Sequence, residues 1–375
     1  MSTAPAPHDI PESTGELDLD YLGAALRRVG QPPPRGPLRI EPLLGGRTGA
    51  TVQRLTVGSA SYVLKLVRER SWQIAGLGVA QGGEHRLWAA GVTRELTGPI
   101  RCPVIDVSRE PSTDRYRVLM SDVSTGIRER GQFKRDDTRA LFSALAAMQA
   151  PHFDGGARRR AHLPAVSGTT RLLRAAVLQL CGKLDSPAPW VLELVDEFKV
   201  VGAFLPLFLE VLGPRLADEY LALVADDSWV DTLDAEPATL LHGDLRRANI
   251  SIGDGAIDLF DWEFAALGPA GCDLQWHCLL HYWGYPPDGT APGDHCDDLA
   301  TWYVDQLGLQ STAPVDREAF ERGWQLGWLR AVALLGYTLV DPLYPDGGDE
   351  ETRGRITTLC RRAVQRALDM RASLT

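Results

Sequence analysis

The chain contains the stretch Leu240-Leu241-His242-Gly243-Asp244-Leu245-Arg246-Arg247-Ala248-Asn249, in which two leucines run into a polar loop. A short β-hairpin is predicted next, with strands at 250–252 and 256–260 folded about Gly253-Asp254-Gly255. Asp261-Trp262-Glu263 follows the second strand, so Asp261 comes twelve residues after Asn249. The hairpin is therefore expected to bring Asp244, Asn249 and Asp261 to one mouth.

These residue types are the ones that phosphoryl transfer requires. A carboxylate must orient and deprotonate the attacking hydroxyl, and oxygen ligands must hold Mg²⁺ on the nucleotide phosphates. An aspartate and an asparagine five residues apart on one loop can face the same metal, and an aspartate after the next strand can complete its coordination. An isolated Gly-Asp pair is usually only a turn former, so the prediction depends on the whole constellation.

The two segments, HGDLRRAN and FDWE, resemble those of the aminoglycoside phosphotransferase family. The loop of that family reads H-G-D-x-x-x-x-N, and its metal aspartate lies in an I-D-W-E-like segment. The resemblance covers about 38–280 of this chain. It implies that Asp244 is the catalytic base, that Asn249 and Asp261 are Mg²⁺ ligands, and that His242 supports the loop.

Other positions match the family pattern or depart from it. The segment GPAGCDL at 268–274 matches the family's glycine-to-aspartate stretch, so the resemblance implies that Asp273 anchors the loop. Arg246, Arg247 and Ala248 stand where many members have His-Pro-Gly, but the essential spacing is unchanged. Gln149 stands where the family commonly has a histidine, and we assign it no role.

The sequence before the loop has the pattern of a small sheet. Three β-like runs at 38–44, 51–57 and 61–67 are joined by Gly-rich turns, which predicts an antiparallel meander. A helix is predicted at 83–90, and further strands at 103–107 and 116–120. Five strands and one helix would make a small α+β lobe. Gly45, Gly46 and Gly49 in the first turn could bring backbone N–H groups close to phosphates.

One of only four lysines, Lys65, lies on the third predicted strand. The resemblance implies that this residue neutralises the nucleotide phosphates and that a helical acid pairs with it. Glu84 is the expected partner, and Glu69, just past the same strand, is the alternative. The resemblance also implies that the segment from Ser121 to Val123 is a hinge whose backbone holds the adenine.

From about residue 136 onward the apolar spacing is helical. The predicted helices cover 140–150, 170–184, 189–212, 216–224, 273–282, 297–306, 317–339 and 352–371. A strand-rich lobe followed by a helical lobe indicates an α+β fold, and the resemblance implies the two-lobed, protein-kinase-like architecture. We expect a flexible tail with one short helix over 1–37, a nucleotide-binding lobe over 38–122, and a helical lobe with the catalytic loop and the acceptor site over 123–375.

Composition and charge restrict the class of protein. The 375 residues are 44% hydrophobic and 23% charged, which excludes wholesale disorder. No apolar run approaches the ~18 residues of a membrane span, and the N-terminus lacks the features of a signal peptide, so we expect a cytoplasmic protein. The net charge of −10 has the wrong sign for a nucleic-acid or membrane partner. Between Asp226 and Glu351, 24 acidic residues face 5 arginines, which either favours cationic substrates or reflects an ordinary solvated surface.

Two further clusters could bind a metal or a substrate. His277 and His281 are spaced i,i+4 on a predicted helix, but with Cys278, His295 and Cys296 they match no closed four-ligand zinc pattern, and helix packing is the commoner role. The six cysteines are far apart and form no CxxC pair. Several aromatic residues could line an acceptor pocket or simply fill the core: Trp276, Tyr282, Trp283 and Tyr285.

The resemblance implies a small-molecule kinase that uses Mg²⁺ and ATP or GTP to phosphorylate a hydroxyl. Candidate acceptors are aminoglycosides and other amino-bearing antibiotics, which would make the protein a resistance enzyme. A metabolic kinase for a sugar, amino sugar or amino alcohol is an alternative, as is a catalytically silent nucleotide-binding protein. A protein kinase is disfavoured because Cys272 follows Asp261 by only eleven residues, too few for an activation segment.

Overall fold

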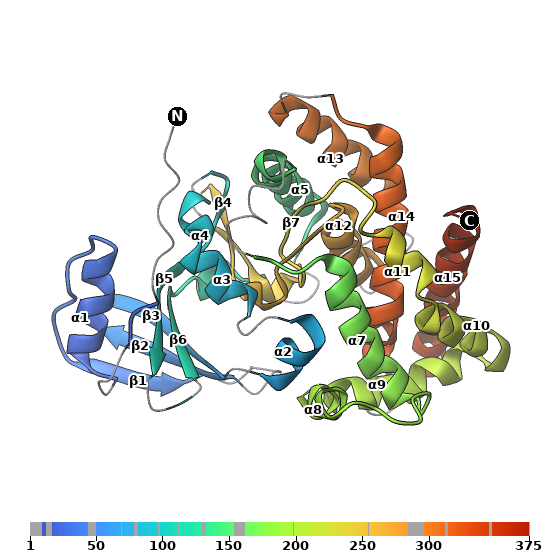
Figure 1. Cartoon of the computed structure of the whole chain (residues 1–375), viewed down its shortest axis with the longest axis horizontal. Helices are drawn as coiled ribbons and strands as arrows, with labels where there is room; N and C mark the ends of the chain where they lie inside the picture. The colour runs from blue at the N-terminus through green and yellow to red at the C-terminus, as the bar shows by residue number, and fades with distance from the viewer. Residues whose placement is uncertain are drawn as a thin grey trace.

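The N-terminal part of the chain forms a five-stranded antiparallel sheet in the order β1-β2-β3-β6-β5 (Figure 1). Its strands are β1 Leu38–Pro42, β2 Thr51–Val57, β3 Ala60–Arg68, β5 Val104–Glu110 and β6 Arg115–Ser121. All five predicted strands are confirmed. The computed structural model describes residues 10–12, 17–43, 50–68, 70–78, 82–96, 98–110, 113, 115–128, 133–153, 162–197, 199–253, 255–283, 296–311, 314–344 and 347–374.

Helix α1 (Leu19–Arg28) is the helix expected within the N-terminal tail, and it packs on one face of the sheet. Asp18 caps its first turn by accepting a hydrogen bond from the Tyr21 N–H at 2.8 Å. The Arg28 guanidinium donates to both oxygens of buried Asp106. The segment that carries α1 therefore contributes to the core of the sheet.

The opposite face of the sheet packs against α3 (Gly83–Ala89), the helix that was predicted at 83–90. The prediction of a single helix in this lobe was wrong, because α2 (Ser71–Leu77) and α4 (Val92–Glu95) flank α3. Both are too short to show a helical hydrophobic period in the sequence. Their position between the sheet and the helical lobe is visible in Figure 1.

The predicted hairpin is confirmed as β8 (Ile250–Gly253) and β9 (Ala256–Leu259). The sequence did not predict that β4 (Ile100–Arg101), from the first lobe, pairs in parallel with β9. It also did not predict the two-stranded sheet of β7 (Thr239–Leu241) and β10 (Ala266–Gly268). The parallel pairing ties the two lobes together just before Asp261.

Apart from these short strands, the described part of the second lobe is mainly helical, as predicted. Its α-helices are α5 Arg135–Gln149, α7 Val166–Leu180, α8 Pro189–Glu197, α9 Lys199–Leu212, α10 Pro214–Ala225, α11 Ser228–Thr232, α12 Gly271–Cys278, α13 Cys296–Gln310, α14 Arg317–Leu335 and α15 Glu350–Leu374. The single helix predicted at 189–212 is two helices, α8 and α9. The helix predicted at 317–339 changes at Gly336 into a 3₁₀ segment, Gly336–Leu343, that contains Pro342.

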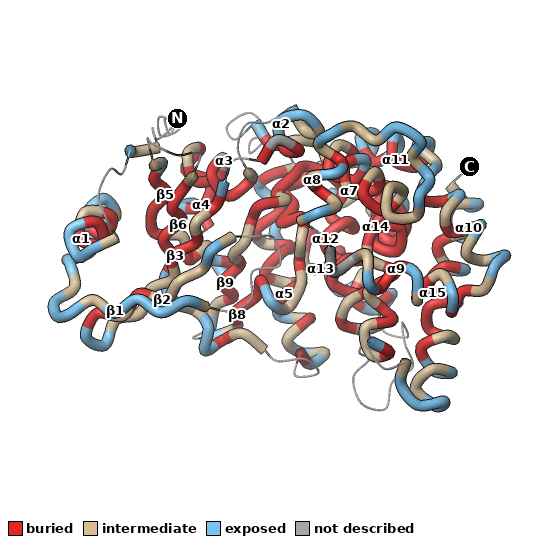
Figure 2. Tube along the Cα trace, turned by 90° about the horizontal axis from the view of Figure 1, so that it is seen from below, coloured by how far each residue is buried: buried red, intermediate tan, exposed pale blue. Residues whose placement is uncertain are grey.

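The centre of the helical lobe is the crossing of α12 and α14, both largely buried (Figure 2). The two helices meet at glycines: a Cβ on Gly327 would lie 2.2 Å from the Gly271 carbonyl oxygen. This close approach fixes α12, which carries Asp273 and Trp276, both hydrogen-bonded to the loop at 242–249. Among the described residues, no helix is both long enough and apolar enough to cross a lipid bilayer.

Candidate active site

The loop after β7 is held by its own backbone N–H groups. His242 N–H and Gly243 N–H donate to the two oxygens of Asp273, at 2.6 and 2.9 Å. Asp273 lies in the first turn of α12 and is almost fully buried, and burial raises the pKa of its carboxyl above the ordinary value. Asp273 therefore makes the anchoring contact that the resemblance implied.

His242 lies behind the loop, where it contacts backbone atoms. Its Nε2 lies 2.9 Å from the Phe260 carbonyl oxygen, and its Nδ1 lies 3.3 Å from the Asp244 backbone nitrogen. A carbonyl only accepts and an N–H only donates, so both contacts require the neutral ring with its proton on Nε2. His242 is fully buried, and it fixes Asp244 through the main chain.

Gly243 is needed for this loop geometry. Its φ of +84° is strained for other residues, and a Cβ there would lie 2.0 Å from the Phe264 carbonyl oxygen. We expect Gly243→Ala to lower the free energy of unfolding by about 3 kcal/mol or more, measured by urea denaturation. Gly354→Ala is the matched control, because its Cβ would meet nothing within 4 Å. Equal stability of the two variants would contradict this reading.

The carboxylate of Asp244 is held on both oxygens. Oδ1 accepts from the indole N–H of Trp276 at 3.1 Å, and Oδ2 accepts from the amide of Asn249 at 3.0 Å. Arg246 Nε also lies 3.0 Å from Oδ2. Because the Asn249 amide nitrogen faces Asp244 in this arrangement, the amide oxygen is turned away from the carboxylate.

Lys65 connects the two lobes. From β3 it reaches Glu84 of α3 at 3.2 Å and Asp261, after β9, at 2.5 Å. The Lys65 side chain is buried, whereas 30% of the Asp261 side chain is exposed. Glu84 is thus a partner of Lys65, as expected, and the alternative Glu69 lies outside the described residues.

Lys65 and Asp261 stabilise each other's charge. Burial lowers the pKa of Lys65, but Asp261 and Glu84 more than offset it and raise that pKa. Burial raises the pKa of Asp261, but Lys65 more than offsets it and lowers that pKa. Between about pH 7 and pH 9 neither group therefore changes its charge.

We accordingly expect the affinity for Mg²⁺-ADP to change by less than about threefold between about pH 7 and pH 9, because the lysine and the aspartate that the family resemblance assigns to the nucleotide and the metal stay charged. Isothermal titration calorimetry at several pH values measures this directly. A loss of affinity that follows a single titration within that range would contradict the assignment.

A second set of charges, which was not predicted, surrounds Glu263, two residues after Asp261. Glu263 accepts from Arg70 and from Gln73, and Arg70 also pairs with Glu197 of α8 at 3.2 Å. Arg70 and Gln73 lie at the start of α2, the helix that was not predicted. These contacts fasten the segment after Asp261 to the first lobe.

The predicted hinge is a short connection between β6 and the helical lobe. Ser121 N–H donates to the Pro103 carbonyl at 3.0 Å, and the Val123 carbonyl accepts from Ser251 of β8 at 2.8 Å. That the hinge backbone holds the adenine of the nucleotide stays a prediction. The glycines assigned to the phosphates, Gly45, Gly46 and Gly49, lie outside the described residues.

The histidines considered as zinc ligands make packing contacts. The ring of His277 packs against Phe133 and Phe142, and His281 accepts from the Arg247 backbone N–H at 3.1 Å. Burial lowers the pKa of His281 to about 3, so its ring is neutral. Within the described ranges, no group of three or more His, Cys, Asp or Glu side chains could hold a metal, and His295 lies outside them.

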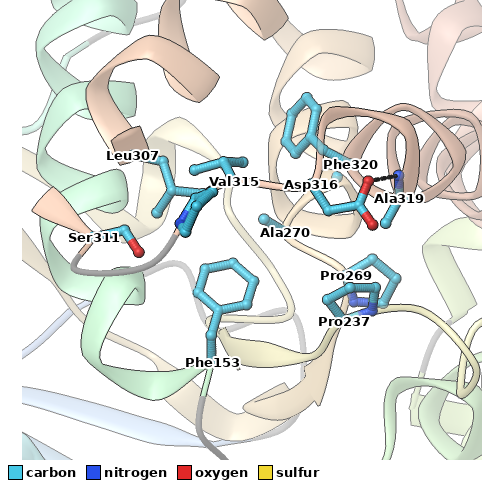
Figure 3. A pocket seen from close by; sticks show the side chains of 13 residues that line it. Phe153, Pro237, Pro269, Ala270, Leu307, Ser311, Val315, Asp316, Ala319 and Phe320 are labelled. Carbon is cyan, nitrogen blue, oxygen red and sulfur yellow. Dashed lines mark hydrogen bonds between the residues drawn. The ribbon is translucent and has the colours of Figure 1, made fainter. Parts of the chain in front are cut away.

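A separate pocket of about 240 Å³ lies where the chain passes from β10 into α12 (Figure 3). Its walls are mostly apolar, with Phe153, Leu307, Val315 and Phe320 facing the cavity. The carboxylate of Asp316 caps α14 by accepting from Ala319 N–H at 3.0 Å. None of the candidate catalytic residues lines this pocket.

Comparisons with known proteins identify the family and the fold of the chain. The model of the phosphotransferase enzyme family matches residues 39–314. The ethanolamine kinase of Plasmodium vivax has the same fold, with a TM-score of 0.51, 12% identity, and coverage of 88% of this chain and 81% of that one.

Two further solved structures resemble the chain. For choline kinase from Cryptosporidium parvum the TM-score is 0.45, with 11% identity and 90% of each chain covered. For spectinomycin phosphotransferase in complex with ADP and spectinomycin it is 0.45, with 15% identity, and 90% of this chain and 94% of that one are covered. Comparison with curated proteins gave no match. The family match spans well over half of the sequence, and the chain therefore belongs to the phosphotransferase enzyme family.

Proposed function

We propose that this protein transfers the γ-phosphoryl group of a Mg²⁺-bound nucleotide to a hydroxyl of a small molecule. The observation that supports this most is that Asp244 contacts Asn249 and Asp261 contacts Lys65, while Arg246 is electrostatically coupled to both aspartates. These residues come from three segments of the two lobes: the loop after β7, the segment after β9, and β3. An oriented carboxylate next to an amide, with a second carboxylate bound to a buried lysine, matches what phosphoryl transfer requires. A protein that had only kept the fold would have no need to retain both pairs.

In this proposal each side chain has one task. Asp244 orients the acceptor hydroxyl and takes its proton, and Trp276 and Asn249 hold the carboxylate in place. Asn249 and Asp261 would hold Mg²⁺, because an amide oxygen and a carboxylate are suitable ligands and phosphates and water complete its shell. The metal would neutralise charge on the phosphates. Lys65 would do the same from the opposite lobe.

The donor is ATP or GTP, and the proposal assigns its base to the hinge from Ser121 to Val123. The reaction would take place in the cytoplasm, where the six free cysteines would stay reduced. In the same proposal the nucleotide-binding lobe begins at about residue 38 and the helical lobe at about residue 123. Strand β6 ends at Ser121, beside the hinge.

The proposal names several classes of acceptor. The acidic surplus between Asp226 and Glu351 is weaker support for a cationic acceptor than the sequence suggested, because many of these acids are paired locally. Asp297 pairs with Arg366 at 2.8 Å and Asp298 pairs with Arg135 at 3.0 Å. Amino-bearing antibiotics are therefore one class to test, beside amino sugars, sugars and amino alcohols.

The experiment is an assay of Mg²⁺-dependent transfer from ATP and from GTP across aminoglycosides, other antibiotics, amino sugars, sugars and amino alcohols. Transfer to a cationic antibiotic would support a resistance enzyme, and transfer only to a sugar or an amino alcohol would support a metabolic kinase. Nucleotide binding with no transfer to any acceptor or to water would contradict the proposed reaction and favour a silent nucleotide-binding protein.

A further inference from the structure

Arg246 lies between the base and the metal ligand of the proposed site. Its Nε is 3.0 Å from Asp244 Oδ2, and Asp244 and Asp261 both stabilise its positive charge and raise its pKa. About 29% of its side chain is exposed, similar to the 30% of Asp261. The guanidinium is therefore partly accessible to solvent beside Asp244, as the Asp261 carboxylate is beside Lys65.

In this state two partners cover the Oδ2 oxygen of Asp244. Trp276 occupies Asp244 Oδ1, while Asn249 and Arg246 both lie against Oδ2. A carboxylate needs an accessible lone pair to receive the proton of an acceptor hydroxyl. Each carboxylate oxygen has two lone pairs, so release of one contact to Oδ2 would free a lone pair on that oxygen for the acceptor hydroxyl. Arg246 is the partner with the poorer hydrogen-bond alignment.

Arg246 and Asp244 attract each other as opposite charges, but their contact lacks the alignment of a hydrogen bond. Although Nε is 3.0 Å from Oδ2, its N–H is not aligned for a hydrogen bond, and it has no hydrogen-bond acceptor among the described residues. The Asn249 amide, by contrast, donates both to Oδ2 and to the Asp244 carbonyl oxygen at 3.0 Å. Arg246 can leave Asp244 without breaking a well-formed hydrogen bond.

The other nearby cations either bind other groups or are shielded from solvent. Lys65 is bound to Glu84 and Asp261, and the Arg247 guanidinium donates to the Arg128 carbonyl oxygen at 3.1 Å. Arg330 is fully buried, and its guanidinium lies over the Trp276 ring at 4.6 Å. Among these side chains, Arg246 alone combines partial exposure with a position against the base.

We propose that Arg246 is a catalytic residue that exchanges Asp244 for the γ-phosphoryl group of the bound donor. This inference rests on the proposed function. On exchange, the guanidinium neutralises charge on the phosphoryl oxygens, and Asp244 Oδ2 becomes accessible to the acceptor hydroxyl. The acceptor oxygen then bonds to the γ-phosphorus, the bond to the β,γ-bridging oxygen breaks with its electron pair on the nucleoside diphosphate, and Asp244 takes the hydroxyl proton.

The test compares two nucleotides, with Mg²⁺ present, in the full-length protein. ADP lacks the γ-group, and AMP-PNP carries it in a form that resists transfer. Arg246→Met should weaken AMP-PNP binding about tenfold or more, because a charge-assisted contact is lost, and should change ADP affinity less than about twofold. Arg247→Met is the matched control, because it removes a neighbouring guanidinium that donates to the Arg128 backbone carbonyl instead of lying against Asp244. It should leave the ratio of the two affinities unchanged. Arg246→Lys should restore part of the AMP-PNP affinity.

An unchanged ratio of AMP-PNP to ADP affinity in Arg246→Met would overturn the inference, as would an equal loss for both nucleotides. Retained ADP affinity shows that the variant is folded. If the unaltered protein bound neither nucleotide, the proposed function would fail together with this inference. If it bound both and the ratio did not respond to Arg246→Met, only the inference would fail.

Discussion

Asp244→Asn is expected to reduce turnover by about 10²- to 10⁴-fold, because asparagine cannot accept the proton of the acceptor hydroxyl. It should leave the affinity for Mg²⁺-ADP nearly intact, because the metal and phosphate contacts are assigned to Asn249, Asp261 and Lys65. The change is nearly isosteric, so Trp276 N–H can still donate to the side-chain oxygen that it contacts at 3.1 Å. The measurement is steady-state transfer with an accepted hydroxyl compound, together with calorimetric ADP binding.

The control for this variant is Asp305→Asn, which makes the same change at an exposed ion pair with Arg317 at 2.8 Å. It should keep both turnover and ADP binding. Near-normal turnover in Asp244→Asn would show that Asp244 is not the base. A parallel collapse of ADP affinity would instead show that Asp244 belongs to the nucleotide site.

The sequence predicted best the features that depend on residues close together in the chain. The spacing from Asp244 to Asn249 and on to Asp261 is determined by one loop and one hairpin, so three side chains could be placed together from the order of residues alone. The five strands of the first lobe were found because each is a short run of strand-forming residues bounded by turn residues. The pairing of Lys65 with Glu84 could be anticipated only through the family resemblance.

What the sequence could not predict depends on contacts between distant segments. Trp276 was noted as an aromatic neighbour, but its contact with Asp244 depends on how α12 is rotated against the loop. The rotation is set by the close crossing of α12 and α14 at Gly271 and Gly327, 56 residues apart. Very short strands such as β4 were missed. Two residues are too few to show a strand pattern, and β4 is extended because it pairs with β9.

Asp261 should determine how strongly nucleotide binding depends on magnesium. Its carboxylate is the proposed metal ligand nearest to Lys65, so replacing it removes both a ligand and the partner that holds the lysine at 2.5 Å. We expect Asp261→Ala to weaken Mg²⁺-ADP binding by about 10- to 100-fold. Asp261→Asn is a second variant, because asparagine tolerates the left-handed backbone at this position, with φ of +64°, better than alanine does.

The decisive comparison is ADP affinity in Mg²⁺ against affinity in EDTA. In the unaltered protein Mg²⁺ should strengthen binding, and both Asp261 variants should lose most of that gain while keeping the metal-free affinity. Asp258→Asn, three residues earlier, is the matched control, because Asp258 pairs with Arg101 through two contacts of 3.0 Å and is assigned no ligand role. If the Asp261 variants kept the full magnesium effect, the metal would have to be held elsewhere. If Asp258→Asn lost it equally, the effect would come from disturbing β9, since that strand carries Asp258 and leads directly to Asp261.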